Sequence, residues 1–219
     1  MQILVTDGAG FISSHLAGSF LGDGHNVMIL ENLEPFHAEG VKRHMLDVHR
    51  EVAEGRAVDY QFVEGDVRDP ETAEALIADA DVVVHWVVQT GVRESVDNPR
   101  KVTDINVDGT VNLLEASKAD VERVILASSS SVYGKPQSLP YEEDHPTEPV
   151  YGVTKLTQEH MAQVCTGLHG LPMVCLRYFT VYDPRMRPNM AISNFASRCM
   201  NGEPPVIYGD GSRRGTSRM

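Results

Sequence analysis

The sequence predicts an α/β fold built on a doubly wound parallel sheet, and three observations lead to this prediction. Short apolar, β-branched runs alternate with amphipathic stretches, which is the pattern of repeated strand–helix–strand units. Two of the runs, Val82–Val84 and Val124–Leu126, are apolar throughout, as strands buried on both faces of a parallel sheet are. The composition, with 42% hydrophobic and 23% charged residues, excludes disordered and fibrous classes.

Each element follows from its local pattern. β-branched and apolar runs predict strands at Ile3–Thr6, Asn26–Leu30, Tyr60–Val63, Val82–His85, Arg123–Ala127 and Met173–Arg177. Apolar residues at helical spacing predict helices at Ile12–Leu21, Pro70–Ile77, Ile105–Lys118 and Tyr151–Leu168. Prolines interrupt the alternation after Phe179. We therefore predict one sheet domain over residues 1–179 and the beginning of a second region over residues 180–219.

The charge balance and the cysteines limit the partners and the location. Asp and Glu number 31 against 19 Lys and Arg, so the formal net charge is −12, a field that repels nucleic acids and anionic membranes. No apolar stretch reaches the roughly 18 residues of a membrane span, and Met1–Val5 carries no signal-peptide pattern. Cys165, Cys175 and Cys199 lack metal-binding spacing. We expect a cytoplasmic protein that binds no metal, nucleic acid or membrane.

A glycine-containing turn joins the first predicted strand to the first predicted helix. Gly8 and Gly10 fit a G-x-G-x-x-G pattern with Ser13 in the third place, and such a turn lets the backbone approach a pyrophosphate. The helix N-terminus then offers unpaired N–H groups to the phosphates. Glu31 ends the second strand, where a carboxylate accepts hydrogen bonds from ribose hydroxyls and favours NAD over NADP. We predict a dinucleotide site; a plain tight turn and a solvated strand end are the alternatives.

A second candidate constellation combines a helix with the end of the fifth strand. Tyr151 and Lys155 are four residues apart, so a helix places them one turn apart on the same face. An ammonium group near the phenol favours phenolate, which makes the tyrosine a usable proton acceptor. The serines at 128–131 follow the fifth strand, at the carboxyl edge where open α/β sheets bind ligands. The Tyr-x-x-x-Lys spacing alone is common. Here it follows the glycine turn, Glu31 and the serine run in that order, so a chance occurrence does not explain the combination.

These motifs together resemble the extended short-chain dehydrogenase/reductase family, which includes NAD-dependent sugar-nucleotide epimerases and dehydratases. Further segments that carry the resemblance are Gly65–Asp69, Gln89–Arg93, Asn106–Thr110, Arg177–Phe179 and Tyr208–Ser212. The resemblance extends from Met1 to about Ser212. It implies a Rossmann-type NAD-binding domain over residues 1–179 and a substrate-binding region over residues 180–219. Because full members of the family are longer, we expect this second region to be incomplete. A homodimer is also implied, paired through the helices at Ile105–Lys118 and Tyr151–Leu168.

The resemblance also assigns roles to individual residues. Ser129, Tyr151 and Lys155 would form the catalytic trio. The NAD site would be lined by Gly8, Gly10, Phe11, Ile12, Glu31, Asn32, Asp66, Val67, Asn106 and Phe179, together with Tyr151 and Lys155. Asp66 would accept a hydrogen bond from the adenine amino group. Trp86, Val87 and Val88 follow the fourth strand along the expected cofactor path, although Trp86 fits an ordinary core position equally well.

The serine run distinguishes between reactions within the family. The dehydratases resemble one another in carrying Thr-Asp-Glu before Val-Tyr-Gly, and the two carboxylic side chains act in the loss of water. Here these positions hold Ser129, Ser130 and Ser131. We therefore expect epimerisation at C4 of a UDP-hexose or UDP-hexuronate through a transient 4-keto sugar. A non-catalytic or degenerate dinucleotide-binding protein, or a nucleotide-sugar reductase or dehydratase, is the alternative.

Several residues depart from the family pattern near the expected cofactor. Asp7 stands where the family usually has glycine, and Ser13 replaces the third glycine of the turn. Val87 and Val88 stand where small residues usually let the cofactor pass. Because a carboxylate repels phosphate, these substitutions lead us to expect weakened NAD binding. These four substitutions favour the alternative of a non-catalytic dinucleotide-binding protein more than a sequence with the usual family residues would.

Overall fold

The computed structural model describes residues 1–34, 38–118, 121–134, 141, 150–188 and 190–207. The contacts divide the chain into two units, Met1–Tyr178 and Phe179–Met219. The first unit contains the sheet. The second contains the helix α8 (Ala191–Met200), which buries none of its residues. Within the described part of the chain, no helix is both long enough and apolar enough to cross a membrane.

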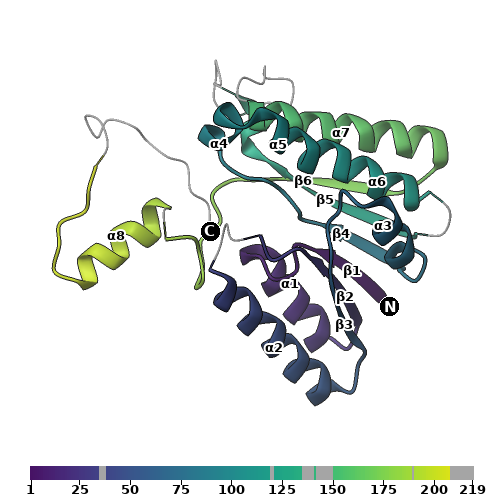
Figure 1. The fold of residues 1–219 in the computed structure, drawn as a ribbon, viewed down its shortest axis with the longest axis horizontal. Coiled ribbons are helices and arrows are strands. Elements are labelled where there is room, and N and C mark those ends of the chain that lie inside the picture. Colours follow the sequence, from purple (N-terminus) through teal and green to yellow (C-terminus); the bar gives the residue numbers. More distant parts are fainter. Residues whose placement is uncertain (35–37, 119–120, 135–140, 142–149, 189, 208–219) are drawn as a thin grey trace. The chain divides into compact units, whose positions relative to one another are not determined.

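The first unit is organised around a single parallel sheet of six strands in the order β3-β2-β1-β4-β5-β6 (Figure 1). The strands are β1 (Gln2–Thr6), β2 (Asn26–Glu31), β3 (Tyr60–Glu64), β4 (Val82–His85), β5 (Arg123–Ser129) and β6 (Met173–Tyr178). All six predicted strands are confirmed, as is the doubly wound α/β class. Thr6 at the end of β1 pairs in register with Leu30 on one side and with His85 on the other. The strand order reverses between β1 and β4, where open α/β sheets bind their ligands.

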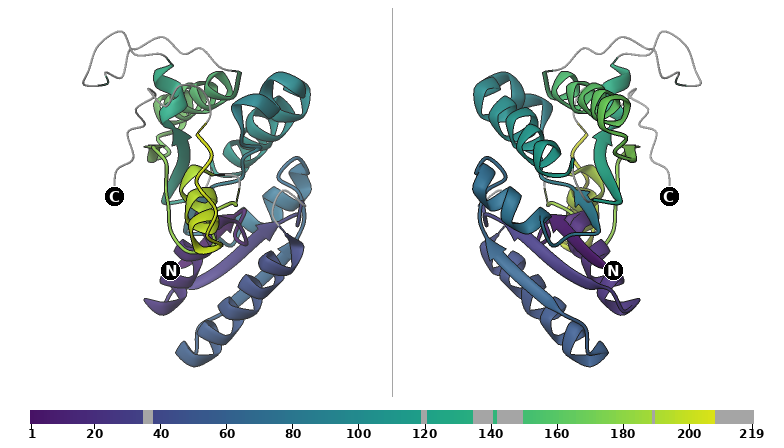
Figure 2. Two further views of the ribbon diagram at one scale, coloured as in Figure 1. Left: turned by 90° about the vertical axis from the view of Figure 1, so that its left-hand side faces the viewer. Right: turned by 90° about the vertical axis from the view of Figure 1, so that its right-hand side faces the viewer.

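Helices cover both faces of this sheet (Figures 1 and 2). The helices α1 (Phe11–Gly22) and α2 (Glu39–Arg56) pack together on one face. On the other face lie α3 (Pro70–Ile77), α6 (Gly109–Ala116) and α7 (Val150–His169). The short elements between strands are α4 (Val92–Asp97), α5 (Pro99–Thr103), the π-helical turn η1 (Asp104–Asp108) and the 3-10 turn η2 (Ser130–Tyr133).

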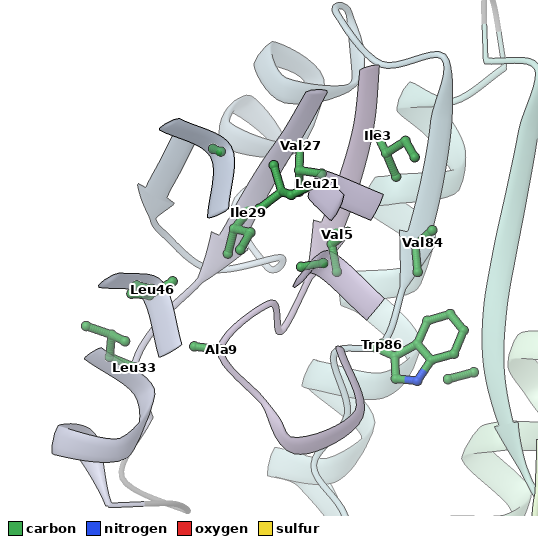
Figure 3. Close-up of a cluster of buried hydrophobic side chains, with 13 residues drawn as sticks. Ile3, Val5, Ala9, Leu21, Val27, Ile29, Leu33, Leu46, Val84 and Trp86 are labelled. Atoms are coloured by element: carbon green, nitrogen blue, oxygen red, sulfur yellow. The ribbon is translucent and has the colours of Figure 1, made fainter. Parts of the chain in front are cut away.

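Alternation along the strands divides the core into two layers. Successive side chains of a strand point to opposite faces, so Val5 packs with α1 and α2 whereas its neighbour Leu4 packs with α3 and α6. Figure 3 shows the first layer, in which Val27 and Ile29 of β2 lie near Leu21 and Leu46. The two layers bury β1, β2 and β4 almost completely, which explains why these strands are apolar without a polar alternate, whereas the outer strands β3 and β6 are partly exposed.

The helices α4, α5 and α8 were not predicted, and two further helical features differ from the expectations. The helix α2 was not predicted, although His49 and Ala53 are buried four residues apart on its inner face. The continuous helix expected over Ile105–Lys118 is instead the π-helical turn η1 followed by α6. Gly109 lies at this junction, and a Cβ there would come 2.6 Å from Cγ2 of Val67. Glycine is needed at this position because the helix start presses against the segment after β3.

This close approach gives a prediction for stability. We expect Gly109→Ala to lower the free energy of unfolding by about 1–3 kcal/mol, because the added methyl group overpacks the contact with Val67. In the matched control Gly167→Ala, on α7, nothing lies within 4 Å of the new Cβ. That variant should gain about 0.5–1 kcal/mol through helix propensity. Urea unfolding of both variants measures the difference, and equal stabilities would contradict the steric role of Gly109.

Candidate functional site

The turn between β1 and α1 forms the first part of the site. Asp7 has a φ of 57°, in the left-handed region that favours glycine, and its N–H donates to the Leu30 carbonyl at 2.9 Å. The Gly10 N–H closes the turn on the Asp7 carbonyl at 2.7 Å. Gly10 is also the N-cap of α1, which has no side-chain cap and no acidic residue in its first turn. The start of α1, at Phe11 and Ile12, is therefore electrostatically suited to an anion.

The two substitutions in this turn contact each other. The Asp7 carboxyl group folds over Gly10, so a Cβ at position 10 would collide with it. Ser13 is buried, its hydroxyl donates to the Asp7 carbonyl, and it lies 3.4 Å from Asp7 Oδ2. Gly8 is equally constrained, since its Cβ would strike Ile29 of β2. Both glycines of the predicted motif are thus required by close packing.

Glu31 ends β2 as expected, but the structure places it in a buried ion pair. Its side chain accepts hydrogen bonds at Oε1 from the Leu33 N–H at 2.8 Å and from Lys42 Nζ at 2.9 Å. Glu31 and Lys42 are only 2% and 3% exposed. The second oxygen, Oε2, is buried and has no hydrogen-bond partner among the described residues. The sequence did not indicate Lys42, because the helix α2 that carries it was not predicted. The Oε2 atom of Glu31 is left for a ligand.

Asn32 and Asp66, predicted for the same part of the site, are brought together at the ends of β2 and β3. Asn32 Nδ2 donates to Asp66 Oδ2 at 3.0 Å. Arg68 donates hydrogen bonds to both oxygens of Asp66, from Nε to Oδ1 at 2.9 Å and from a terminal nitrogen to Oδ2 at 2.7 Å. These hydrogen bonds lower the pKa of Asp66 to about 2, so it is an anion at neutral pH. Val67, the next predicted residue, is buried against Gly109.

The predicted catalytic trio lies where β5 meets α7. Lys155 is 1% exposed and donates to the Ala127 carbonyl of β5 at 2.6 Å. Burial is the main cause that lowers the pKa of Lys155 to about 7. Tyr151 lies in the first turn of α7, and its N–H donates to the Ser95 hydroxyl at 3.2 Å. Ser129 is the last residue of β5, and its hydroxyl accepts from the Ser131 N–H at 3.1 Å.

A buried ion pair fastens α7 to the edge of the sheet below this trio. Arg177 of β6 donates to both carboxylate oxygens of Glu159, at 2.9 and 2.7 Å, and the Ser128 hydroxyl donates to the same carboxylate. Burial raises the pKa of Glu159, but these hydrogen bonds outweigh it and the pKa falls below its ordinary value. The Arg177 guanidinium also lies 4.8 Å from the centre of the Tyr133 ring. The pair fixes α7 against β5 and β6.

A buried polar network joins the other side of α7 to the centre of the sheet. The Thr6 hydroxyl accepts from the Trp86 and Val87 N–H groups at 3.0 and 3.2 Å, so its own proton donates to His85 Nδ1 at 2.9 Å. His85 Nε2 therefore carries the ring proton and donates to the Thr110 hydroxyl at 3.0 Å. Burial, and secondarily the charge of Lys155, lower the pKa of His85 to about 3. His85 is a neutral imidazole held in one tautomer, and no motif in the sequence indicated it.

Asn106, predicted to line the cofactor site, is fully buried within the same frame. Its Oδ1 accepts from the Gln89 N–H at 2.8 Å, and its Nδ2 donates to the Thr154 hydroxyl at 3.1 Å. Gln158 Nε2 adds a hydrogen bond of 2.6 Å to the Asn106 carbonyl. The side chain of Asn106 thus ties the segment after β4 to α7, beside Tyr151.

The remaining predicted residues follow β4 or open the second unit. Trp86 is buried in the first core layer, with its ring centre 5.7 Å from that of Tyr178, and its Nε1 has no partner in the described part of the chain (Figure 3). Val87 and Val88 are partly exposed, and Phe179 is the first residue of the second unit. The expected substrate segment Tyr208–Ser212 lies outside the described residues.

The donors and acceptors present fit a dinucleotide. An uncapped helix N-terminus suits a pyrophosphate, and two buried polar atoms, Glu31 Oε2 and Trp86 Nε1, have no protein partner among the described residues. Such orphaned groups are rare unless a ligand or water satisfies them. A search of the described residues finds no group of three or more His, Cys, Asp and Glu side chains that could hold a metal ion.

The chain is similar to known proteins over nearly its whole length. Residues 3–214 match the model of the NAD-dependent epimerase/dehydratase family. A protein of Methanocaldococcus jannaschii named as a putative UDP-glucose 4-epimerase is 36% identical over 97% of this chain and 67% of its own length. A probable UDP-glucuronate 4-epimerase of Rhizobium meliloti is 35% identical over 96% of this chain and 62% of its own length.

A solved structure agrees with these relatives. The UDP-glucuronic acid 4-epimerase of Bacillus cereus, in complex with UDP-glucuronic acid and NAD, superposes with a TM-score of 0.85 and 35% identity. The match covers 97% of this chain and 67% of that one. The chain therefore spans about two thirds of the length of the relatives that it matches.

The hydrogen-bond assignment around His85 is testable. We expect Thr6→Val to lower the free energy of unfolding by about 1–3 kcal/mol for each buried group that it leaves without a partner. The groups affected are His85 Nδ1 and the Trp86 and Val87 N–H groups. Thr157→Val is the matched control, because that exposed hydroxyl only donates to a carbonyl of its own helix. It should change stability by less than about 0.5 kcal/mol.

The same assignment predicts a pH dependence. The pKa of His85 is about 3 in the folded chain and 6.5 ordinarily, so only the unfolded chain takes up this proton between those values. The contribution of His85 to stability therefore falls as the pH drops from 6.5 towards 3. Nitrogen-15 NMR of labelled histidine should show an unchanging Nε2-protonated ring at His85 from pH 8 to pH 5. A ring that titrates near 6.5 would refute the assignment.

Proposed function

The chain belongs to the NAD-dependent epimerase/dehydratase family, and from this premise we propose that it epimerises a UDP-hexose or UDP-hexuronate at C4. The relatives compared above are UDP-sugar 4-epimerases by name, and the family is NAD-dependent. The observation that carries the proposal within the chain is the end of β5. The positions that hold Thr-Asp-Glu in the dehydratases hold Ser129, Ser130 and Ser131 here, so the acid–base pair needed for loss of water is missing.

The roles proposed for the chain's own residues follow from their positions. Tyr151 removes the proton of the sugar 4-hydroxyl and later returns it, and Ser129 donates a hydrogen bond to the same oxygen. NAD bound in this site would supply the acceptor for the C4 hydride and the source from which it returns to the opposite face. Lys155 has a pKa of about 7, so its charge is available near neutral pH to favour the Tyr151 phenolate. Tyr151 therefore takes up and releases the proton of the sugar hydroxyl, and the charge of Lys155 sets how easily the Tyr151 hydroxyl itself loses its proton.

The residues proposed to hold NAD lie along the carboxyl ends of β1 to β4. The N-terminus of α1, from Gly10 onward, would face the pyrophosphate. Glu31, through Oε2, would accept one hydroxyl of the adenosine ribose, and Asp66 would accept from the adenine amino group. Trp86 would direct its unpaired Nε1 towards this edge. The unpaired buried atoms support this arrangement.

We further propose a homodimer that pairs through α7. Val153, Val164 and Leu168 are 47%, 56% and 74% exposed, and their spacing puts them along one side of the helix. Leu114 lies on the other helix expected to pair, but it is buried in the second core layer. An isologous contact between two copies of this apolar side would remove it from water.

The proposed location is the cytoplasm. The three cysteines are free thiols, and Cys199 is exposed. An exposed free thiol is compatible with a reducing compartment, where it remains unoxidised.

The reaction is tested by incubating the chain with NAD and either UDP-glucuronate or UDP-glucose. We expect the C4 epimer, identified by proton NMR, and no net change in NADH absorbance. A 4-keto-6-deoxy product would show a dehydratase, and a net absorbance change would show a reductase or dehydrogenase. No product with either substrate, together with bound dinucleotide released on denaturation, would replace the proposal by a non-catalytic binding function.

The proton acceptor is tested by Tyr151→Phe, which removes the hydroxyl and keeps the ring. We expect turnover to fall by roughly two to four orders of magnitude, the contribution of a general base. Tyr60→Phe is the matched control, because the Tyr60 hydroxyl is buried at the start of β3 and has no partner among the described residues. Its turnover should match wild type. An unchanged rate in Tyr151→Phe would remove this residue from the mechanism.

The dimer is tested by sedimentation equilibrium. We expect twice the monomer mass of 24.1 kDa at micromolar concentration. Val164→Glu should give the monomer mass, because a charge in the centre of the apolar side opposes its burial. Val96→Glu, at a 63% exposed position on α4, is the control that should remain dimeric. A monomeric wild type, or a dimeric Val164→Glu, would contradict pairing through α7.

A further inference from the structure

The Asp7 carboxyl group faces the interior of the turn. It folds over Gly10, lies 3.4 Å from the Ser13 hydroxyl, and is within hydrogen-bonding reach of the Glu31 carboxylate. Glu31 in turn binds Lys42 of α2. The described charged groups that act on Asp7 are thus Glu31 on β2, Lys42 on α2 and Lys155 on α7. Two carboxyl groups share one close ammonium group at the edge of the predicted dinucleotide site.

The donors around Glu31 leave one of its oxygens without a hydrogen bond in the ligand-free chain. Glu31 Oε1 accepts from the Leu33 N–H and from Lys42 Nζ, whereas the buried Oε2 accepts from none of the described residues. Two ionised carboxylates cannot form a hydrogen bond with each other, because neither has a donor. A proton on Asp7 supplies a donor for one lone pair of Oε2, leaves the other lone pair for the ribose hydroxyl, and makes the Asp7–Glu31–Lys42 cluster electrically neutral.

We propose that Asp7 is a protonated, neutral member of the dinucleotide site, hydrogen-bonded to Glu31 Oε2, and that loss of this proton weakens binding of the pyrophosphate. The proposal rests on the dinucleotide site of the proposed function. Burial and the neighbouring Glu31 carboxylate raise the pKa of Asp7 well above its ordinary value, which agrees with the donor count. The repulsion expected from an aspartate in place of glycine therefore arises only above the raised midpoint of Asp7.

The consequence for binding follows from charge. With Asp7 protonated, the positive end of α1 faces an electrically neutral cluster, and the phosphates meet no opposing charge. When Asp7 ionises, its proton leaves to solvent and the cluster carries one net negative charge beside the pyrophosphate. Binding and protonation are then linked, so affinity falls about tenfold per pH unit above the midpoint of Asp7.

The protonation state is tested directly on the ligand-free chain. Carbon-13 NMR of a chain labelled at aspartate carboxyl carbons, with the Asp7 signal identified by its loss in Asp7→Asn, gives the midpoint. We expect it well above the ordinary value of about 3.9. In Glu31→Gln the midpoint should fall, because one negative charge beside Asp7 is gone. A midpoint at or below about 3.9 in the wild type, or no fall in Glu31→Gln, overturns the shared proton.

The role in binding is tested with ADP-ribose, which carries the adenosine and the pyrophosphate but no nicotinamide. Calorimetric titration over a pH range that spans the midpoint found by NMR should show affinity falling for the wild type and staying constant for Asp7→Asn, whose amide can still donate to Glu31. Asp81→Asn is the control, since Asp81 accepts from the Gln2 N–H at the opposite end of β1. It should keep the slope of the wild type.

The outcomes separate this inference from the proposed function. Equal slopes in wild type and Asp7→Asn, or no binding of ADP-ribose by either chain at any pH, overturn the role in binding. If Asp7→Asn does not fold, loss of the slope in Glu31→Gln supports the role and its retention overturns it. If Asp7 shows the raised midpoint and the pH-dependent binding of ADP-ribose but the chain forms no epimer, the inference stands and only the proposed function is contradicted.

Discussion

The reversal of strand order between β1 and β4 is the constraint on which the rest of the structure depends. Because β1 leads to α1 on one face of the sheet and β4 leads to elements on the other, the carboxyl ends of these strands are left open between the helices. The backbone N–H groups at this edge must still be satisfied. One hydroxyl, that of Thr6, accepts two of them, and this fixes the proton on His85 and the position of Thr110. The backbone at the open edge is therefore held by the same buried hydrogen bonds that fix His85 and Thr110.

Burial makes each charge at this edge depend on a neighbour. Glu159 remains ionised despite its burial because Arg177 donates to both of its oxygens, and the same arrangement with Arg68 lowers the pKa of the partly exposed Asp66 further. Among the described residues Lys155 donates to a carbonyl rather than to a carboxylate, and burial therefore lowers its pKa towards neutrality. Because burial lowers its pKa to about 7, Lys155 can gain or lose its charge near neutral pH. This response is the property required of a residue that assists proton transfer at Tyr151.

The parts of the molecule that the sequence predicted are those set by local pattern. All six strands, and the placement of Ser129, Tyr151 and Lys155 near one strand end, follow from apolar runs, helical spacing and chain order. Lys42, His85 and the requirement for Gly109 could not be predicted, because each depends on a contact between segments distant in the chain. Lys42 reaches Glu31 only after α2 folds back on β2, and Gly109 is constrained only by Val67. The Tyr-x-x-x-Lys spacing likewise could not show that Lys155 donates to Ala127.

The departures from glycine in the first turn also have a structural explanation when taken together. Asp7 adopts a φ of 57°, which costs a non-glycine residue about 1–2 kcal/mol, and its carboxyl group occupies the space above Gly10. The Ser13 hydroxyl, which replaces a hydrogen of the usual glycine, donates to the Asp7 carbonyl and so holds that strained residue in place. Asp7 in turn occupies the space that a side chain at position 10 would need, and its carboxyl group lies beside Glu31 and Lys42. The turn has thus exchanged bare glycine for a set of side chains that satisfy one another, and the phosphate-facing N–H groups of α1 keep their orientation.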